Sequence, residues 1–540
     1  MIMEILVLLI MGILLIYKSR KSLHMLQQNL YNENNRYIKW IIKNKGYLVN
    51  IEIFAIFLIA IGLFVTFDFE TYFIIVMFLI SFLYAIQILF WTKNKAGEQT
   101  KKPLVITARI KRLIVTTSIL YLIPVVLLLF CYDSMKSLWL YLFIISIMLY
   151  LNLFVVLLAR IINTPVEKCV YFYYLNKAKS TLRDRKNLKI IGITGSYGKT
   201  SSKNVLGEIL NIKYNALPTP KNLNTPYGLM ITINNHLDKF TDVFIAEMGA
   251  YKKGEIKDLC GLVHPKYGII TVLGKAHLES FGSEENIKQG KMELIESLPK
   301  DGLGVLNGDD YKQIDYVKTD LKNDVPLKWI GIENEDVDVR AVNIKCSHKG
   351  TSFDVVFKGD KTKYPFETKL LGSYSVYNIL AAIALGREFD IEISDLQKAV
   401  SLVKAVEHRL ELKRLGNFYQ IDDAYNSNPV GAKAAVKILG MMPGTKVVVT
   451  PGMVELGEKE DEYNREFGRQ IAEVADYVCL IGEKKSRPIK EGLKEAGFKD
   501  KNIIVYNDVK EAYKFINGLT ASKKDVYALF ENDLPDTYNE

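Results

Sequence analysis

A glycine-rich segment at residues 192–203, GITGSYGKTSSK, carries residue types that bind phosphate groups. Gly195 and Gly198 have no side chain, so backbone N–H groups can approach phosphate oxygens closely. Lys199 can reach the β- and γ-phosphates of a nucleotide, and the Thr200 hydroxyl can ligate Mg²⁺. The spacing of these four residues predicts a site for nucleotide phosphates and Mg²⁺.

The segments on either side of this loop fit a strand and a helix. Residues 190–193 form a short apolar run, and the apolar residues of 205–210 recur at helical spacing. A phosphate loop requires this context, because the helix N-terminus adds partial positive charge. Ile193 stands where the general GxxxxGK[ST] pattern has its first glycine, so a structural turn is the alternative.

Three residues further along the chain can complete such a site. Glu247 follows the apolar run 243–246, which places a carboxylate at the C-terminal end of a strand; a loop carboxylate is the alternative. His277 can bind a metal ion or cap a helix. Lys291 lies in a helical pattern, where most lysines are simply solvated. From these residues alone, both interpretations of each stay open.

The segment TGSYGKTS at residues 194–201 resembles the TG-x-x-GKT-[ST] loop of the Mur ligases, the ATP-dependent amide ligases of peptidoglycan synthesis. The segments at 274–287 and 290–310 are similar to the MurF branch, which adds D-alanyl-D-alanine to a UDP-muramoyl tripeptide. Further similar segments follow in the family's order: TPKNLNTPYGL (219–229), IAEMGAYKKGEI (245–256), EHRLEL (407–412), DDAYNSNP (422–429) and GMVELGE (452–458). The ordered series is far more specific than any one member.

The resemblance implies roles for individual residues. The nucleotide-binding residues would be Gly195, Ser196, Tyr197, Gly198, Lys199, Thr200, Ser201, Asn307 at the adenine, and Arg409 and Asp423 at phosphate and ribose. The metal ligands would be Thr200, Glu247, His277 and Lys291, the last as a carbamylated lysine. The catalytic residues would be Lys199, His277, Lys291 and Arg409, and the substrate-binding residues Asn222, Asn224, Tyr425, Asn426 and Asn428.

The expected reaction transfers the γ-phosphoryl group of ATP to a substrate carboxylate, and an amine then attacks the acyl phosphate. The resemblance implies ATP and Mg²⁺ as cofactors. It implies as partners a UDP- or lipid-linked cell-wall peptide, an amino acid or dipeptide, and membrane lipid, without nucleic acid. Two alternatives remain: a ligase for another polymer or lipid-linked peptide, poly-γ-glutamate-like or amidating, and a non-catalytic membrane scaffold that binds nucleotide.

The sequence departs from the family's pattern in three places. Apolar sequence stands where the family has its UDP-substrate domain, so we expect an acceptor presented at a membrane. GSYSVYN at 372–378 keeps only Gly372 and Asn378 of the family's GxHNxxN segment. ENDLPDTYNE at 531–540 replaces a basic turn suited to a carboxylate, which predicts an amine substrate with a different terminal group. A solvated acidic tail is the alternative.

Five apolar runs at 2–17, 47–67, 72–91, 113–132 and 138–158 precede the loop. The last four have the ~20 residues that a bilayer core requires. Basic residues concentrate in alternate connections, so positive-inside reasoning places the N-terminus outside and the catalytic domains in the cytoplasm. We therefore expect a multi-pass protein of the cell membrane.

The fold expected from these patterns is a multi-pass α-helical membrane domain followed by α/β domains. Residues 1–160 would form the membrane domain with about five transmembrane helices, and 161–186 a basic and aromatic linker. Residues 187–405 would form a P-loop ATPase domain with a mainly parallel sheet and a small antiparallel subdomain. Residues 406–540 would form a Rossmann-like C-terminal domain.

The composition restricts the possible partners and binding sites in two ways. The chain has 540 residues and a net charge of +10, and many of its basic residues lie beside apolar runs, so the charge need not indicate nucleic acid. The five cysteines form no CxxC pair, which argues against a disulfide framework or a zinc site.

Overall fold

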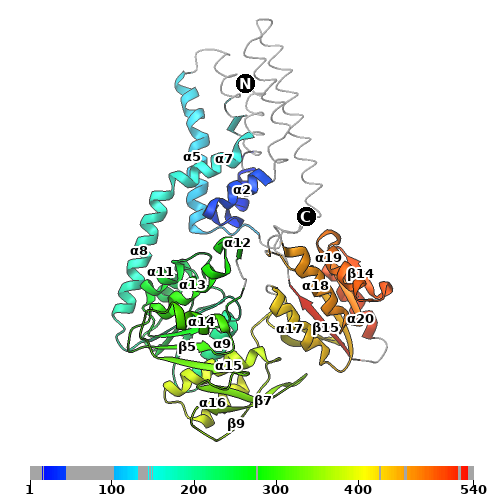
Figure 1. The fold of residues 1–540 in the computed structure, drawn as a ribbon. Coiled ribbons are helices and arrows are strands. Elements are labelled where there is room, and N and C mark those ends of the chain that lie inside the picture. Colours follow the sequence, from blue (N-terminus) through cyan, green and yellow to red (C-terminus); the bar gives the residue numbers. More distant parts are fainter. Residues whose placement is uncertain are drawn as a thin grey trace. The chain divides into compact units, whose positions relative to one another are not determined.

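The computed structural model describes residues 15, 18–43, 103–131, 144, 147–148, 150–274, 278–424, 427–454, 456, 459–520 and 525–532. The chain divides into two compact units, Met1–Phe172 and Tyr173–Glu540. Figure 1 shows the helices and strands of both units.

The first unit is helical in its described part. A small core joins its helices, with Leu26, Tyr37, Ile110 and Val156 fully buried. Residues 18–28 are helical. The elements that follow them are η1 (Leu30–Asn35), α2 (Arg36–Lys43), α5 (Ala108–Cys131), α7 (Asn152–Ile162) and α8 (Thr164–Arg183), which continues into the second unit.

No helix in the described part of the chain combines the length and the apolar character needed to cross a membrane. The prediction of a multi-pass membrane domain, with the N-terminus outside and the catalytic domains cytoplasmic, is therefore wrong for these residues. The runs at 47–67 and 72–91, and nearly all of 2–17, lie outside the described residues. The finding also leaves membrane lipid unsupported as a partner.

A physical reason is visible in α7, which contains part of the last run. Helix α7 has 11 residues, so it rises only about 16 Å against a hydrocarbon core of ~30 Å. It begins with Asn152, whose buried amide donates to the Tyr121 hydroxyl at 2.7 Å. Helix α5 begins with basic residues, and Arg112 pairs with Glu167 at 2.8 Å. The length of an apolar run alone does not register these polar contacts.

The second unit begins with a nine-stranded sheet in the order β2-β3-β1-β4-β5-β6-β7-β8-β9. Strands β1 to β7 pair in parallel, and β7, β8 and β9 form the predicted antiparallel meander as a continuation of the same sheet. The bounds are β1 (Lys189–Thr194), β2 (Ala216–Pro218), β3 (Val243–Glu247), β4 (Tyr267–Ile270), β5 (Leu303–Asn307), β6 (Leu327–Gly331), β7 (Val339–Ser347), β8 (Gly350–Phe357) and β9 (Tyr364–Thr368).

Strand β1 lies between β3 and β4, so the chain reverses its direction of winding there. In open α/β sheets, ligands bind at the carboxyl ends of the strands at such a switch point. The glycine-rich loop follows β1 directly, and Glu247 ends β3. The topology thus places the two strongest sequence candidates at one edge of the sheet.

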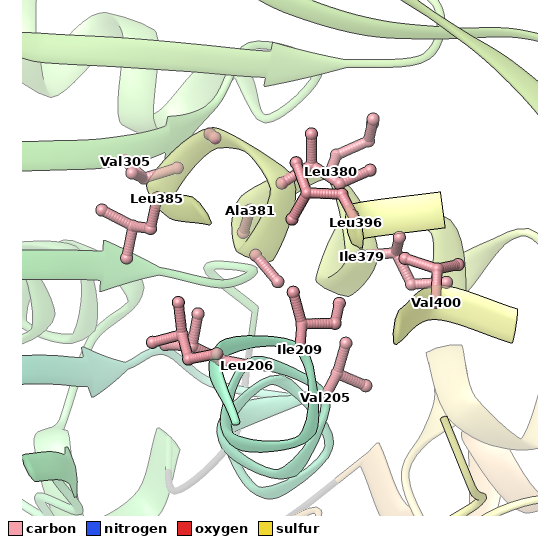
Figure 2. Packing of buried hydrophobic residues seen from close by; sticks show 14 of the residues in the cluster. Val205, Leu206, Ile209, Val305, Ile379, Leu380, Ala381, Leu385, Leu396 and Val400 are labelled. Carbon is pink, nitrogen blue, oxygen red and sulfur yellow. The ribbon is translucent and has the colours of Figure 1, made fainter. Parts of the chain in front are cut away.

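Helices cover this sheet and form its core. The apolar stripe of α9 (Lys199–Leu210), with Leu206 and Ile209, faces α15 (Tyr374–Glu388), as Figure 2 shows. Leu396 and Val400 of α16 (Ile393–Leu402) extend the same cluster. The remaining helices are α10 (Pro226–Asn235), α11 (Glu255–Val263), α12 (Leu278–Phe281), α13 (Glu284–Glu296) and α14 (Tyr311–Thr319).

A second sheet of six strands has the order β10-β11-β15-β12-β13-β14. Only the β10–β11 pair is antiparallel, which fits the predicted doubly wound domain. The strands are β10 (Glu411–Leu415), β11 (Phe418–Asp423), β12 (Thr445–Thr450), β13 (Tyr477–Ile481), β14 (Ile503–Tyr506) and β15 (Val526–Glu531); the helices are α17 (Pro429–Gly440), α18 (Glu460–Ala472), α19 (Glu483–Glu495), η4 (Asp500–Asn502) and α20 (Val509–Leu519).

Candidate active site

The glycine-rich loop is held against the neighbouring strand by backbone and hydroxyl contacts. Ser196 donates its N–H to the Val272 carbonyl at 2.7 Å, and the Thr271 hydroxyl donates to the Tyr197 carbonyl at 2.5 Å. A Cβ on Gly195 would lie 2.0 Å from Oγ1 of Thr271, so the position admits only glycine. Gly198 has a φ of +80° where α9 begins. The loop conformation therefore depends on both glycines.

Lys199 folds back over this loop. Its Nζ donates to the Gly195 carbonyl at 2.7 Å and to the Ser196 carbonyl at 3.2 Å. Burial lowers the pKa of Lys199 to about 8; the Glu247 carboxylate opposes this shift and the Arg409 charge adds to it. A bound phosphate group would offer this ammonium a stronger, charged acceptor than a carbonyl does.

Glu247 is the centre of a buried polar cluster. Its Oε1 accepts from the Thr200 hydroxyl at 3.1 Å and from the Asn224 amide at 2.9 Å. Its Oε2 lies 3.0 Å from Nζ of Lys203, and both side chains are 1% exposed. Lys203 also donates to the Lys221 carbonyl at 2.6 Å. The loop, the strand end and the asparagine-rich segment are therefore tied together by one carboxylate.

Sequence reasoning missed Lys203. The available signal was its spacing, because it lies one helical turn after Lys199 and therefore on the same side of α9. A lysine on an amphipathic helix is ordinarily solvated, and only the fold reveals the buried partner.

The oxygen atoms around Thr200 fit Mg²⁺. This ion prefers hard oxygen ligands and retains several waters, so one carboxylate and one hydroxyl suffice on the protein side. Among the described residues, none donates a geometrically regular hydrogen bond to Oε2 of Glu247, whose charged neighbour is Nζ of Lys203 at 3.0 Å. No group of three or more histidine, cysteine or acidic residues that could hold a metal ion occurs in the described ranges.

Lys291 is buried on α13. Its Nζ donates to the Ala250 carbonyl at 3.1 Å. Burial lowers the pKa of Lys291 well below its ordinary value, and the nearby Lys199 charge adds to the shift. An amine that is uncharged at neutral pH can react with carbon dioxide, which is the chemistry that a carbamylated lysine requires.

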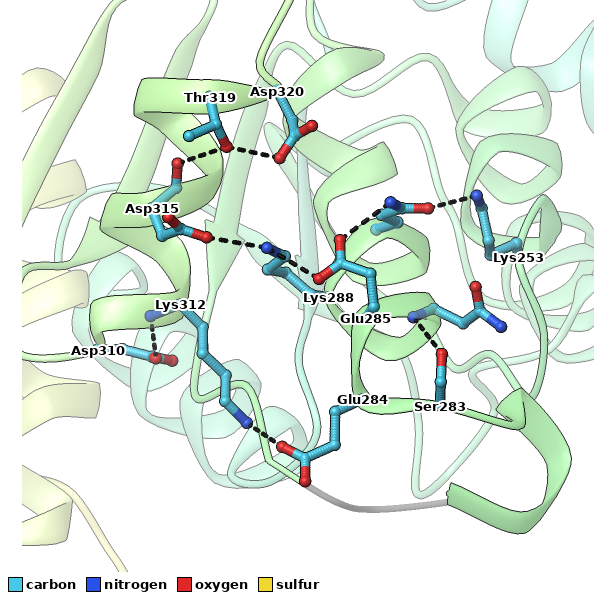
Figure 3. Close-up of polar contacts among 12 residues, drawn as sticks. Lys253, Ser283, Glu284, Glu285, Lys288, Asp310, Lys312, Asp315, Thr319 and Asp320 are labelled. Carbon is cyan, nitrogen blue, oxygen red and sulfur yellow. Dashed lines mark hydrogen bonds and ion pairs between the residues drawn. The ribbon is translucent and has the colours of Figure 1, made fainter.

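Ion pairs on the outer side of α13 fix the helix that carries Lys291 (Figure 3). Lys288 lies 3.0 Å from Glu285 on its own helix and 3.0 Å from Asp315 on α14. Lys312 of α14 pairs with Glu284 at 2.8 Å. The Ser283 hydroxyl caps the helix by accepting from the Asn286 N–H at 3.1 Å.

A cavity of about 460 Å³ collects most of the predicted site residues. Its lining includes Ser196, Tyr197, Gly198, Lys199, Thr200, Ser201, Asn222, Asn224, Glu247, Asn307, Arg409, Asp423 and Asn428. Gly195 shapes the loop from behind, and Lys291 lies outside the lining. His277, Tyr425 and Asn426 lie outside the described residues.

Arg409 reaches this cavity from a segment with unusual backbone geometry. His408 and Leu410 on either side of it have φ values of +60° and +48°. Left-handed geometry costs about 1–2 kcal/mol at a residue other than glycine. Two contacts offset it: the Leu410 N–H donates to Oδ1 of Asp423 at 3.2 Å, and Nδ1 of His408 lies 2.8 Å from Oδ2 of Asp422.

The segment at 372–378, which departs from the family's GxHNxxN motif, still contributes residues to the cavity. Asn378 accepts a hydrogen bond from the Ser202 hydroxyl, and Tyr377 donates to Oδ2 of Asp309 at 2.8 Å. Burial, followed by the Asp309 carboxylate, raises the pKa of Tyr377. Asn307, at the end of β5, accepts from the Asp309 N–H at 2.9 Å. Tyr377 was not among the predicted residues, because the family's motif leaves that position unspecified.

Comparison with known proteins settles the family. The Mur ligase middle domain matches residues 193–386, and the Mur ligase glutamate ligase domain matches residues 408–530. The UDP-N-acetylmuramoyl-tripeptide–D-alanyl-D-alanine ligase of Bacillus subtilis is 32% identical over 342 residues, covering 63% of this chain and 72% of that protein. The chain belongs to the Mur ligase family.

Other Mur ligases extend the comparison. The Escherichia coli ligase of the same name is 30% identical over 306 residues, covering 56% of this chain and 66% of that protein. The MurF ligase from Thermotoga maritima, solved with ADP, is 26% identical with a TM-score of 0.58, covering 67% of this chain and 80% of that chain. This Mur ligase is accordingly an ATP-dependent, ADP-forming enzyme that makes an amide bond in peptidoglycan synthesis.

Proposed function

We propose that this Mur ligase joins D-alanyl-D-alanine to the terminal carboxylate of a UDP-muramoyl tripeptide. The relatives named for that reaction support the choice of substrates. The observation that carries the proposal is the single cavity in which Lys199, Thr200 and Glu247 meet Arg409 and Asp423. A cavity that gathers cations beside a carboxylate and a hydroxyl suits a nucleotide and a second anion together.

In the first step, an oxygen of the substrate carboxylate bonds to the γ-phosphorus of ATP, and the bond from that phosphorus to the β-phosphate oxygen breaks. Lys199 and the backbone N–H groups at the start of α9 hold the phosphates in place. Arg409 adds a second cation as negative charge spreads over the transferred group.

In the second step, the neutral amine bonds to the acyl carbon, the bond from that carbon to the phosphate oxygen breaks, and a proton leaves the nitrogen. The products are the amide, ADP and phosphate. Asn222, Asn224, Tyr425, Asn426 and Asn428 are proposed to hold the two peptide substrates.

Mg²⁺, when bound, would neutralise negative charge on the nucleotide phosphates. Thr200 and Glu247 would hold it there. A second ion would be held by His277 and by Lys291 as its carbamate. Asn307 would bind the adenine and Asp423 the ribose. The limits 187–405 and 406–540 remain our proposal for the two ligase domains.

The test supplies the full-length protein with ATP, Mg²⁺, UDP-N-acetylmuramoyl-tripeptide and D-alanyl-D-alanine. We expect ADP release that requires both peptides, and a product heavier than the tripeptide by one dipeptide less one water. Lys199→Ala should lower both signals by about 10²–10³-fold. ADP release that ignores the dipeptide, with no heavier product, would overturn the proposed substrates.

A further inference from the structure

Two carboxyl groups lie side by side at the inner wall of the nucleotide cavity. Asp423 ends β11 and Glu531 ends β15, and the two residues are in register in adjacent parallel strands. Side chains in register on neighbouring strands project to the same face about 5 Å apart. Asp423 is 8% exposed and lines the cavity, whereas Glu531 is 1% exposed and lies behind it.

The contacts of Glu531 leave room for one proton between these groups. Its Oε1 accepts from the Ser427 hydroxyl at 2.6 Å. Its Oε2 is buried and receives no hydrogen bond from any donor among the described residues. The neighbouring carboxyl group is that of Asp423, its partner in register on β11. Two neighbouring buried carboxyl groups favour holding one proton between them, because two buried negative charges would repel each other strongly.

The surrounding charges agree with a pair that holds one proton. Burial raises the pKa of both carboxyl groups, and their mutual repulsion raises that of Glu531 further. Arg409 favours ionisation of both groups, and Asp422 disfavours ionisation of Asp423. The same Arg409 charge acts on Lys199 in the phosphate loop, which connects the pair electrostatically with the nucleotide site.

We propose that Glu531 is a positioning residue for nucleotide binding: it shares one proton with Asp423 and so sets the charge that Asp423 presents to the cavity. The inference rests on the proposed nucleotide site. While the proton is held, the pair carries a single negative charge. When it is lost, a second charge appears near the nucleotide phosphates, which repel it.

The sequence pattern had suggested either a binding role or a solvated tail for residues 531–540. Glu531 is buried, so it is no part of a solvated tail. Residues 533–540 lie outside the described part of the chain. The inference therefore concerns Glu531 alone, as the partner of Asp423.

The experiment measures ADP affinity by calorimetry between pH 6 and 9 on the full-length protein. In the wild type, the affinity for ADP should fall as pH rises. One linked proton can lower this affinity by at most about tenfold per pH unit. Glu531→Gln should flatten this fall, because glutamine cannot ionise and its amide can donate to Asp423. Loss of the Lys199 proton weakens ADP binding in both proteins. The effect of Glu531 is therefore read from the difference between the wild-type and the Glu531→Gln pH profiles.

Two further variants sharpen the result. Asp525→Asn changes an exposed acid just before β15 and should leave the wild-type profile unchanged. Ser427→Ala removes the hydrogen-bond donor that favours ionised Glu531, so the pair should keep its proton to a higher pH. The fall in ADP affinity should therefore begin at a higher pH than in the wild type. This second variant keeps the test decisive if Glu531→Gln folds poorly.

Superimposable profiles for the wild type, Glu531→Gln and Ser427→Ala would overturn the inference while leaving the nucleotide site intact. Absence of ADP binding in the wild type at every pH would overturn the proposed function as well. The two failures are therefore distinguishable.

Discussion

Nζ of Lys203 lies 3.0 Å from Oε2 of Glu247, and each side chain is 1% exposed. The pair joins α9, which follows the phosphate loop, to the end of β3. Removing one member of a buried ion pair leaves the other charge without compensation, which costs about 3–5 kcal/mol.

Lys203→Met should therefore lower the free energy of unfolding by about 3–5 kcal/mol in urea titrations. Adding Glu247→Gln to this variant should restore part of the loss, because the uncompensated charge is then removed. Lys300→Met is the control, since Lys300 pairs with Asp324 at the surface, with 81% and 85% of the side chains exposed. Its effect should be below about 1 kcal/mol. Equal effects of the two methionine variants would contradict the structural role of Lys203.

Lys199→Ala should lower ATP turnover by about 10²–10³-fold when both peptide substrates are present. Loss of one positioned cation at a transferred phosphoryl group typically has an effect of this size. Lys213→Ala, which changes an exposed lysine just after α9, should keep wild-type turnover. A coupled assay for ADP measures the rate, and thermal unfolding confirms that each variant is folded. Turnover at the wild-type rate in Lys199→Ala would remove this residue from the mechanism.

Lys291 should carry a carbamate. Burial lowers its pKa, so a larger fraction of the amine is uncharged near neutral pH and open to carbon dioxide. Removal of bicarbonate should reduce wild-type activity, and its return should restore it. With ¹³C-bicarbonate, the carbamate resonance should appear in the wild type and be absent from Lys291→Ala.

The variant Lys291→Ala should also be inactive at any bicarbonate concentration. Lys300→Ala, which changes a surface lysine with 81% of its side chain exposed, should respond to bicarbonate as the wild type does. A wild-type rate in Lys291→Ala would eliminate the carbamate from the mechanism.

Glu531→Gln should stabilise the protein increasingly as pH rises above about 5. The pKa of Glu531 is higher in the folded chain than in the unfolded chain, because burial disfavours its ionised form. Above the unfolded value of ~4.3 the unfolded chain holds fewer protons, so wild-type stability falls with pH, by at most about 1.4 kcal/mol per unit for one group. Glutamine removes this penalty.

Thermal unfolding of both proteins between pH 4 and 8 checks this prediction. The midpoints should converge near pH 4 and separate as pH rises. A constant difference across that range would mean that Glu531 ionises normally in the fold.

The sequence identified what lies close together along the chain. The loop around Gly195 and Lys199 follows a strand and opens a helix as expected, and Glu247 ends a strand beside it. These features are local, so the order of residues predicts them. Contacts across the fold were not visible in this way: Ser427 and Glu531, 104 positions apart, meet only because β11 and β15 are neighbours.

The apolar runs before residue 160 show where the length of a run fails as a predictor of structure. Run length predicted spanning helices, yet the run that contains Asn152 is interrupted by a buried amide that bonds to Tyr121. Single polar residues within apolar runs carry information that an average over the run discards. Tyr377 likewise contacts Asp309 across the fold, where the family's motif gave no guidance.

Helix α15 has a practical consequence for shortening the chain. Of its 15 residues, Val376 and all of 379–386 are buried. A fragment ending before residue 374 would expose one apolar face of the long sheet to water and should aggregate on expression. A protease should spare this helix and cut near Glu407 and His408, which are exposed, because Val403 before them still belongs to the same buried core.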